Sequence, residues 1–343
     1  MMQQSPSTRS IKPHKSRRSA ARRLGLSVLA MLACIQAPLA QADEKVTLRT
    51  DWVNSGYHAI WYYGIDRGLF KAEGIDLEVL EGRGSASTAQ TVANGSTMFG
   101  TSDAGTVMTL VSQGLPLKIV GGYLRQNPMA LIFPQKTGWK KIQDMNGARV
   151  AYSPGGASAQ LLPAVLKAAG MEGKIRLINV EGAAKPAALL EGKADAIESF
   201  DFLQVPLFEA NNMPVSTFTY AGQGINVPGL SLVAGRDIAL KNPALTKKMV
   251  ALMEKSIIAA RKDPEGAIDA LLKRSPTLNR AISMRILMLS FNLTEPDWGK
   301  GHSLAWLSPE VMERAQDILN QYGSLKEKQP IGSYFTNEFV PGN

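Results

Sequence analysis

The sequence predicts an α/β protein of two domains, in which mostly parallel sheets are flanked by helices. Ten short strand-like runs alternate with segments of helical spacing, and this alternation is typical of sheets covered by helices. The first 42 residues are expected to be a cleaved leader, so 343 − 42 = 301 residues remain, enough for two domains of roughly 150 residues each. From Asn242 onward the pattern is helical only. A helical tail cannot form a third sheet, so we expect it to pack on the first domain.

The predicted strands lie at 46–50, 76–80, 97–100, 117–120, 130–134, 149–152, 176–180, 194–198, 215–220 and 230–234. Polar loops follow three of the early strands, at 51–58, 81–87 and 101–105. In an open α/β sheet, loops at the carboxyl ends of the strands line the ligand crevice. We therefore expect a binding site among these loops.

Several segments resemble one family of proteins. Asp51-Trp52, His58, the segment 68–79 and the segment 192–196 are similar to solute-binding proteins of ABC importers for nitrate, sulfonates, taurine and thiamine-type pyrimidines. The resemblance covers nearly everything after the leader. It implies a type II periplasmic-binding-protein-like fold, with two lobes joined by a two-strand hinge. It also implies a small-molecule ligand in the cleft, and a membrane ABC permease with its ATPase as partners.

The same resemblance implies where the domains divide. Lobe 1 is expected to comprise residues 43–134 and 230–343, and lobe 2 residues 135–229. Two crossing segments then make a hinge about which the lobes close on a ligand. The terminal residues 329–343 carry Pro and Gly, and we expect them to form a loosely docked tail.

The first 42 residues read as an export signal peptide. They hold seven basic residues and no acidic one, then an apolar stretch from Leu24 and the small-x-small sequence Ala40-Gln41-Ala42. We expect cleavage near Ala42 and a periplasmic mature chain. The apolar stretch falls short of the roughly 20 residues that a membrane span needs. Twin-arginine export and lipoprotein anchoring at Cys34 are the alternatives.

The basic character of the sequence belongs mostly to this leader. The chain has 38 basic and 29 acidic residues, and without the seven basic residues of the leader the balance is 31 − 29 = +2. No Lys/Arg cluster interleaved with aromatics follows, which argues against nucleic acid as a partner. The single cysteine, Cys34, lies in the leader, so the mature chain is expected to have no disulfide and no thiol nucleophile. We expect a monomer with no cofactor.

Six ring-bearing residues fall within 12 positions: Trp52, Tyr57, His58, Trp61, Tyr62 and Tyr63. Flat rings in a cleft stack on planar ligands, while their N–H and O–H groups set the orientation. We expect Trp52, His58 and Tyr62 to face the cleft, and Trp61 and Tyr63 to pack in the core. The alternatives are that any one ring belongs to the core, and that His58 is a hydrogen-bonded structural group.

A loop of small residues follows the predicted strand 149–152, with candidate ligand contacts at Ser153, Gly155, Gly156 and Ser158. Small residues let backbone N–H groups approach a ligand, and a helix N-terminus favours negative charge or a strong acceptor. The alternative is an ordinary turn in which Ser158 caps the helix.

A weaker signal of the same kind occurs at Gly84 and Ser85. It lacks the dinucleotide fingerprint, and no Gly-Lys-Ser/Thr sequence occurs, so nucleotide binding is unsupported.

Carboxylates also follow apolar strands, at the same predicted edge. Ser102 and Asp103 follow one strand and Glu198 ends another. Such acids would accept hydrogen bonds from ring nitrogens or amines and favour a heterocyclic or cationic solute, whereas the Gly/Ser loop favours an anion, and both remain open. Asp103 and Asp201 could instead cap the helices that follow them. Glu198 has no local capping role.

Capture of a small polar organic solute, of sulfonate, nitrate or pyrimidine type, is the function that these features and the resemblance indicate. The resembling family includes a thiamine-pyrimidine synthase, but that enzyme depends on a cysteine-rich motif that this chain lacks. No Gly-x-Ser-x-Gly occurs, and only two histidines follow the leader, which argues against a catalytic triad or a zinc site. An exported ligand sensor with the same cleft is a further alternative.

Overall fold

The computed structural model describes residues 1–2, 7, 10, 43–322 and 324–342. The chain divides into two units, Met1–Ala42 and Asp43–Asn343. The expected leader and its cleavage near Ala42 lie largely outside the described residues. None of the helices in the described part has the length and hydropathy that crossing a bilayer requires.

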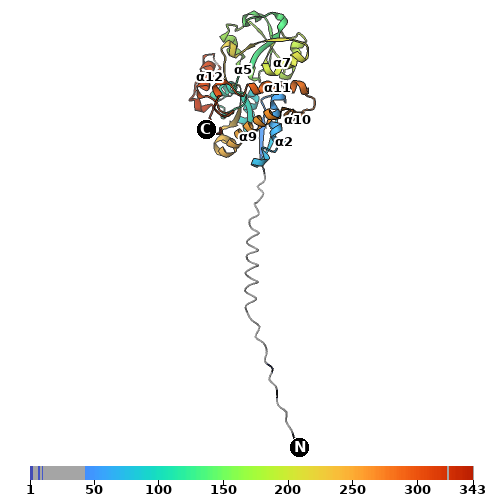
Figure 1. The fold of residues 1–343 in the computed structure, drawn as a ribbon. Helices are drawn as coiled ribbons and strands as arrows, with labels where there is room; N and C mark the ends of the chain where they lie inside the picture. Colours follow the sequence, from blue (N-terminus) through green and yellow to red (C-terminus); the bar gives the residue numbers. More distant parts are fainter. Residues whose placement is uncertain (3–6, 8–9, 11–42, 323, 343) are drawn as a thin grey trace. The chain divides into compact units, whose positions relative to one another are not determined.

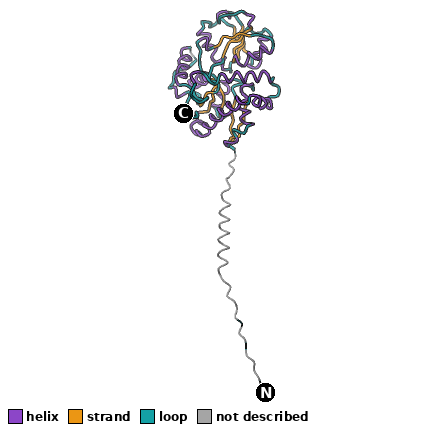
Figure 2. The backbone as a smooth tube through the Cα atoms, in the orientation of Figure 1, coloured by secondary structure: helices purple, strands orange, loops and turns teal. Residues whose placement is uncertain are grey.

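Two five-stranded sheets form the centres of two lobes in the described chain. The strands are β1 (Glu44–Arg49), β2 (Ile75–Leu80), β3 (Phe99–Asp103), β4 (Leu117–Gly122), β5 (Met129–Pro134), β6 (Arg149–Tyr152), β7 (Arg176–Asn179), β8 (Ala196–Phe200), β9 (Val215–Thr219) and β10 (Leu230–Gly235). Each overlaps one of the predicted runs, so the two-lobed α/β prediction is confirmed. Figure 1 shows the green and yellow segments as one lobe, and the strands lie inside both lobes in Figure 2.

The strand order is β2-β1-β3-β10-β4 in one sheet and β7-β6-β8-β5-β9 in the other, and in each sheet four strands run in one direction and a single strand runs against them, so the sheets are mostly parallel, as predicted. β1 pairs in parallel with β2 and β3, while β10 runs antiparallel to β3 and β4. The second sheet repeats this scheme, with β6 parallel to its neighbours and β5 antiparallel to β8 and β9. The two antiparallel strands are those that the chain enters after crossing from the other lobe.

Residues 129–134 were expected in lobe 1, but they form β5 of the second sheet. Every residue of β5 is buried. An uninterrupted apolar run predicts a strand covered on both faces, but it carries no information about which sheet the strand joins.

Helices cover the sheets. They are α2 (Ala59–Asp66), α3 (Ser85–Ala93), α4 (Ala104–Ser112), α5 (Ala157–Ala168), α6 (Lys185–Leu190), α7 (Asp201–Ala210), α8 (Arg236–Lys241), α9 (Pro243–Lys262), α10 (Pro264–Arg274), α11 (Arg280–Asn292) and α12 (Pro309–Gln321). Short 3-10 turns are η2 (Gly56–His58), η3 (Lys71–Glu73), η4 (Gln135–Thr137), η5 (Ile142–Met145), η6 (Gly182–Ala184), η7 (Ala221–Gln223), η8 (Asp297–Gly299) and η9 (Ile331–Ser333).

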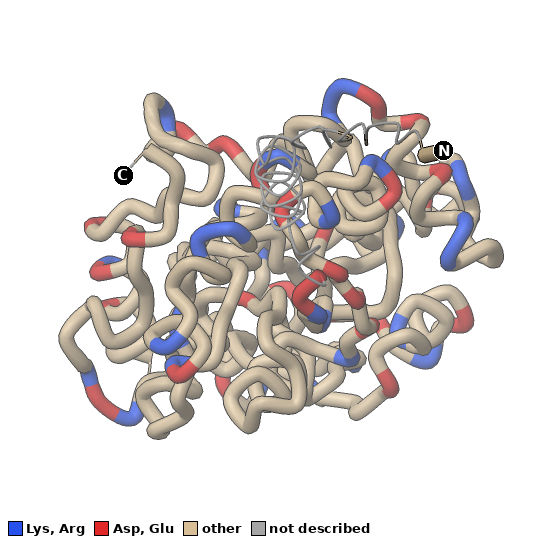
Figure 3. Tube along the Cα trace, turned by 90° about the horizontal axis from the view of Figure 1, so that it is seen from below, with Lys and Arg blue, Asp and Glu red and all other residues tan. Residues whose placement is uncertain are grey.

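The helical tail from residue 242 packs on lobe 1, as predicted. Pro243, Pro264 and Pro309 each begin a helix, a position where the missing proline N–H costs nothing. α9 and α10 both pack against α2 (Figure 1). Arg274 at the end of α10 also pairs with Asp66 of α2, Nη2 to Oδ1 2.5 Å. In Figure 3, basic and acidic positions are interspersed along the trace.

Two segments cross between the lobes, residues 123–128 and 220–229. The N–H groups of Tyr123 and Leu124 both donate to the Leu230 carbonyl at 2.9 Å, which ties one crossing to the other. A Cβ on Gly229 would lie 2.4 Å from the Leu124 carbonyl oxygen, so this close approach requires glycine. The crossings therefore act as one paired hinge.

The C-terminal segment is packed rather than loosely docked, and the tail prediction for 329–343 is wrong. Phe335 forms a parallel bridge with Ile119 of β4. The Ile119 N–H donates to the Tyr334 carbonyl at 2.9 Å, and the Thr336 N–H donates to the Ile119 carbonyl at 3.0 Å. Tyr334, Phe335 and Phe339 are buried. The segment covers the free edge of β4, and its Pro and Gly content concealed these aromatic anchors.

This packing predicts the effect of truncating an anchor. Phe335→Ala should lower the free energy of unfolding in urea by about 3 kcal/mol, because it removes a buried ring and leaves a cavity. Leu240→Ala, at an exposed position of α8, should change it by less than about 0.5 kcal/mol. Equal effects of the two substitutions would show that the segment is not part of the core.

Candidate functional site

A narrow cleft lies where strand ends of the two sheets meet. Its lining comes from lobe 1 (Asp51, Trp52, Tyr57, Ser85) and from lobe 2 (Gly156, Ala157, Ser158, Lys185, Ser199, Phe200, Leu203). The space left between these residues is about 30 Å³. Across the cleft, the Ala86 N–H donates to the Gly155 carbonyl at 3.3 Å. The lobes are therefore closed on each other.

Glycines permit this closure. A Cβ on Gly84 would lie 2.1 Å from the Gly155 oxygen, and the Gly84 φ of 137° is itself a conformation that favours glycine. A Cβ on Gly182 would lie 2.0 Å from the Trp52 ring. The Trp52 indole thus contacts the lobe 2 backbone at Gly182, although Trp52 belongs to lobe 1.

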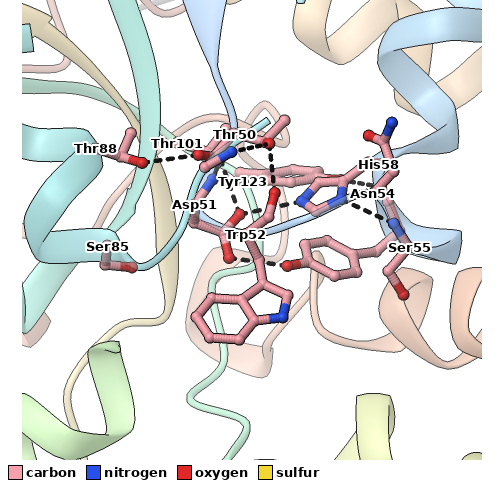
Figure 4. A network of polar contacts seen from close by, with 12 residues as sticks. Thr50, Asp51, Trp52, Asn54, Ser55, His58, Ser85, Thr88, Thr101 and Tyr123 are labelled. Atoms are coloured by element: carbon pink, nitrogen blue, oxygen red, sulfur yellow. Dashed lines mark hydrogen bonds and ion pairs between the residues drawn. The ribbon is translucent and has the colours of Figure 1, made fainter. Parts of the chain in front are cut away.

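Asp51 holds the lobe 1 wall together. Its Oδ2 accepts from the Tyr57 hydroxyl at 2.8 Å, and its Oδ1 accepts from Thr101 Oγ1 at 2.9 Å. The Asp51 N–H in turn donates to Thr101 Oγ1 at 2.8 Å. Figure 4 shows these contacts converging on one carboxylate, with the Trp52 indole pointing away from them. A carboxylate offers about four acceptor positions, and Tyr57, Thr101 and His58 Nε2 occupy three of them, so one more donor could still be received.

His58 lies behind Asp51 and is fully buried, which matches the structural-group alternative. The Ser55 N–H donates to His58 Nδ1 at 3.2 Å, so the ring proton is on Nε2, which lies 3.3 Å from Asp51 Oδ1. The imidazole therefore positions Asp51 and does not line the cleft.

Tyr57 was not among the expected site residues, yet its ring lines the cleft. Burial, and then the neighbouring Asp51 carboxylate, raise the pKa of Tyr57 well above its ordinary value, so the hydroxyl stays protonated and donates. The expected Tyr62 lies outside the cleft lining, where its hydroxyl donates to Asn54 Oδ1 at 2.7 Å. Trp61 and Tyr63 are buried, as predicted.

Glu198 anchors the lobe 2 wall and is fully buried. Its Oε1 accepts from the Ser153 N–H at 2.9 Å and from Lys185 Nζ at 2.6 Å, and its Oε2 accepts from the Ser158 hydroxyl. Lys185 also donates to the Glu198 carbonyl at 2.7 Å. The only basic side chain in the cleft lining of the described chain is therefore neutralised by a carboxylate.

Gly156 is the N-cap of α5, so the Ser158 capping alternative is wrong. The first N–H groups of a helix have no partner within it. Gly156, Ala157 and Ser158 line the cleft, which places this helix N-terminus beside any bound acceptor.

Ser102 and Asp103 lie one layer behind Ser85. The Ser102 hydroxyl donates to the Ser85 carbonyl at 3.0 Å, and the Asp103 N–H donates to the Ser85 hydroxyl at 3.1 Å. Asp103 caps α4 by accepting from the Thr106 N–H at 2.9 Å. Asp201, by contrast, is the first residue of α7 rather than its cap.

Of the twelve expected site residues, those that line the cleft are Trp52, Ser85, Gly156 and Ser158. The residues that sequence reasoning missed are Asp51, Tyr57, Ala157, Lys185, Ser199, Phe200 and Leu203. Asp51 lies in the first polar loop, and the expectation that loops at the carboxyl ends of strands line the ligand crevice could have identified it. Lys185 begins a six-residue helix and carries no local signal.

Asp103 predicts a pH dependence of stability. Burial raises the pKa of Asp103 to about 7, despite the hydrogen bonds from Thr106. The folded state then holds a proton that the unfolded chain, with an ordinary pKa near 3.8, releases. This contribution to stability is present in full below about pH 4 and is lost as the pH rises to about 7, by at most roughly 1.4 kcal/mol per pH unit.

Asp103→Asn keeps a capping oxygen but cannot titrate. Urea unfolding from pH 4 to 8 should show that the variant gains stability relative to the wild type as the pH rises. Only the difference between the two proteins is read, because carboxylates such as Asp66, whose pKa is lowered by Arg274, act in the opposite direction. A constant difference across this range would refute the expectation.

The Lys185–Glu198 pair predicts strong coupling. Lys185→Met leaves the Glu198 carboxylate buried without its cation and should cost about 3–5 kcal/mol of unfolding free energy, whereas Lys185→Met with Glu198→Gln should recover most of it. In the exposed pair Lys241–Asp237, Lys241→Met should cost less than about 1 kcal/mol. Additive effects of the two cleft substitutions would contradict the coupling.

The sequence and fold have relatives among known proteins. The family model described as NMT1/THI5 like matches residues 55–267. The riboflavin-binding protein RibY of Chloroflexus aurantiacus is 23% identical over 315 residues, which are 89% of this chain and 89% of that protein. The 4-amino-5-hydroxymethyl-2-methylpyrimidine phosphate synthase of Uromyces fabae is 22% identical over 272 residues, 75% of this chain and 78% of that protein.

Among solved structures, the alkanesulfonate-binding protein SsuA from Xanthomonas axonopodis pv. citri bound to MOPS superimposes with a TM-score of 0.67 at 17% identity. The match covers 87% of this chain and 99% of that one. This likeness establishes the two-lobed periplasmic-binding-protein fold. Because the family model spans more than half of its length, the chain belongs to the NMT1/THI5-like family.

Proposed function

We propose that this protein is the solute-binding component of an ABC importer, and that it captures a flat nitrogen heterocycle of the pyrimidine or flavin type without converting it. The supporting observation is the pairing of an acceptor with donors across the cleft. Asp51 has one acceptor position left on the lobe 1 wall, and the α5 N-terminus offers N–H groups on the lobe 2 wall. A pyrimidine-type ring presents an N–H or amino donor and a carbonyl or ring-nitrogen acceptor.

The rings of the cleft favour a flat ligand. Trp52, Tyr57 and Phe200 all contribute to the lining. Aromatic walls stack on planar bodies, whereas an aliphatic solute gains no such contact. The closed cleft leaves only about 30 Å³, which is room for about one water molecule, so a heterocycle enters after opening about the paired hinge and is held with the lobes somewhat further apart than they are here.

Charge disfavours the nitrate and sulfonate classes that were also expected. A small anion would have only the α5 N-terminus to receive it, because the Lys185 ammonium group already pairs with the Glu198 carboxylate. Asp51 adds a second carboxylate to the wall. Leaving either acid uncompensated on anion binding would be costly in a buried site.

The relatives support the same ligand class. RibY is named for riboflavin, whose ring system contains a pyrimidinedione, and the fungal relative is named for a pyrimidine phosphate. The synthase relatives make a pyrimidine-synthase-like enzyme the second candidate. The chain after the leader has no cysteine, whereas the resembling synthase depends on a cysteine-rich motif.

The cellular setting that we propose follows from the fold and the leader. Residues 1–42 direct export to the periplasm, the mature chain acts as a monomer, and the closed form docks on a membrane permease driven by an ATPase. A signalling receptor in place of the permease is the alternative for the same cleft.

Ligand class is tested by thermal shift and calorimetry on the mature chain. Lumichrome or 4-amino-5-hydroxymethyl-2-methylpyrimidine should stabilise the protein, by about 2.7 kcal/mol at a hundredfold excess over Kd, because each binds only the folded state. Asp51→Asn and Trp52→Ala should each weaken binding at least tenfold. Asp76→Asn, at an exposed position of β2, should leave it unchanged.

Two outcomes would refute the proposal. Stabilisation by nitrate, taurine or MOPS with no response to either heterocycle would favour an anion carrier. Chemical conversion of a bound heterocycle by the purified protein, followed by mass spectrometry, would favour the enzyme.

A further inference from the structure

A second cavity adjoins the cleft and is much larger, about 330 Å³. It lies between α7 of lobe 2 and α11 of lobe 1, which face each other in Figure 1. The two cavities share Trp52 and Leu203 as lining residues, so these side chains form the partition between them. A ligand that extends past Trp52 would enter this space without leaving the interface of the lobes.

The lining of this outer cavity has a consistent chemistry. Leu207 of α7 and Ile282 and Ile286 of α11 provide apolar surface. Asn54, Asn279 and Ser283 add amide and hydroxyl groups. None of the described residues that line it is charged. Such a volume and mixture are typical of a site for an uncharged small molecule.

Gln204 gives a separate indication of a ligand. Its side chain is only 7% exposed and lines the outer cavity. Within the described part of the chain, its Oε1 has no hydrogen-bond donor. A buried amide oxygen without a donor costs free energy, and most such groups in folded proteins have a partner. A hydroxyl group on a ligand would satisfy it.

We propose that the cavity between α7 and α11 is the outer compartment of the ligand site, and that the ligand is a heterocycle bearing an uncharged, hydroxylated extension. This proposal rests on the proposed function. The ring occupies the cleft beside Asp51, and the extension passes Trp52 to place its hydroxyl groups near Gln204 and its carbon atoms against Ile282. Because α7 and α11 belong to different lobes, the extension contacts both and binds best when they are closed.

Three related probes separate the compartments by fluorescence titration. Lumichrome has the ring system alone, riboflavin adds an uncharged hydroxylated chain, and flavin mononucleotide adds a phosphate to that chain. The wild type should bind riboflavin at least tenfold more tightly than lumichrome. It should bind flavin mononucleotide at least tenfold more weakly than riboflavin, because no cation in the cavity receives the phosphate.

Two variants localise the effect. Gln204→Met keeps the side-chain length but removes the acceptor, and Ile282→Trp fills the cavity. Each should weaken riboflavin binding about tenfold, as expected for the loss of roughly one hydrogen bond or of the space itself. Each should change lumichrome binding less than twofold, which also shows that the fold is intact. Gln143→Met, at an exposed position of lobe 2, is the matched control.

Equal affinity for lumichrome and riboflavin, or equal losses for both in the variants, would overturn the outer compartment while leaving the proposed function in place. Failure of lumichrome, riboflavin and 4-amino-5-hydroxymethyl-2-methylpyrimidine alike to bind would overturn the proposed function and this inference with it.

Discussion

The buried Asp51 carboxylate is the interaction on which the cleft depends. It receives donors from η2 and from β3, so the end of β1, the turn after it and the neighbouring strand are fixed to one group. A buried carboxylate is tolerated only when its hydrogen bonds are made. The same constraint sets the position of Trp52, the next residue, whose ring must then project toward lobe 2 (Figure 4).

Lobe 2 contains a second buried carboxylate, Glu198, whose charge is compensated by hydrogen bonds and an ion pair. Glu198 ties β8 to the loop before α5 and to Lys185, as Asp51 ties the strands of lobe 1. Each wall therefore carries a buried acid that is satisfied mainly by its own lobe. This arrangement lets the lobes separate without breaking either network, so opening exposes aromatic surface and helix N–H groups rather than unpaired charge.

The sequence predicted much of this fold because its signals were local. Alternating apolar runs gave all ten strands, and proline at first turns marked α9, α10 and α12. The sequence pattern does not show which segments far apart in the chain pair with each other. The apolar run of β5 could not show which sheet it joins, and the Pro/Gly segment around Phe335 could not show that it covers β4.

The residues of the site could be predicted only in part, for the same reason. Residues at strand ends, such as Trp52, Ser85 and Ser158, could be found from the polarity of their loops. Lys185 could not be found in this way, because its place in the site depends on its ion pair with Glu198, which lies 13 residues away and in a different element. His58 and Tyr62 were expected to face the cleft, but residues 56–58 form the 3-10 turn η2, and Tyr57 rather than His58 lines the cleft.

Closure and selectivity are linked through the Trp52 contact. The indole reaches lobe 2 only because Gly182 has no side chain, and it then stands between the cleft and the outer cavity. A ligand that occupies both spaces must pass this ring, and the ring can press on it only when the lobes are closed. Selection by ligand shape therefore takes place in the closed state. There, a buried polar atom without a partner, such as Gln204 Oε1, raises the free energy most, so the free energy of closing depends on how well the ligand supplies hydrogen bonds to such atoms.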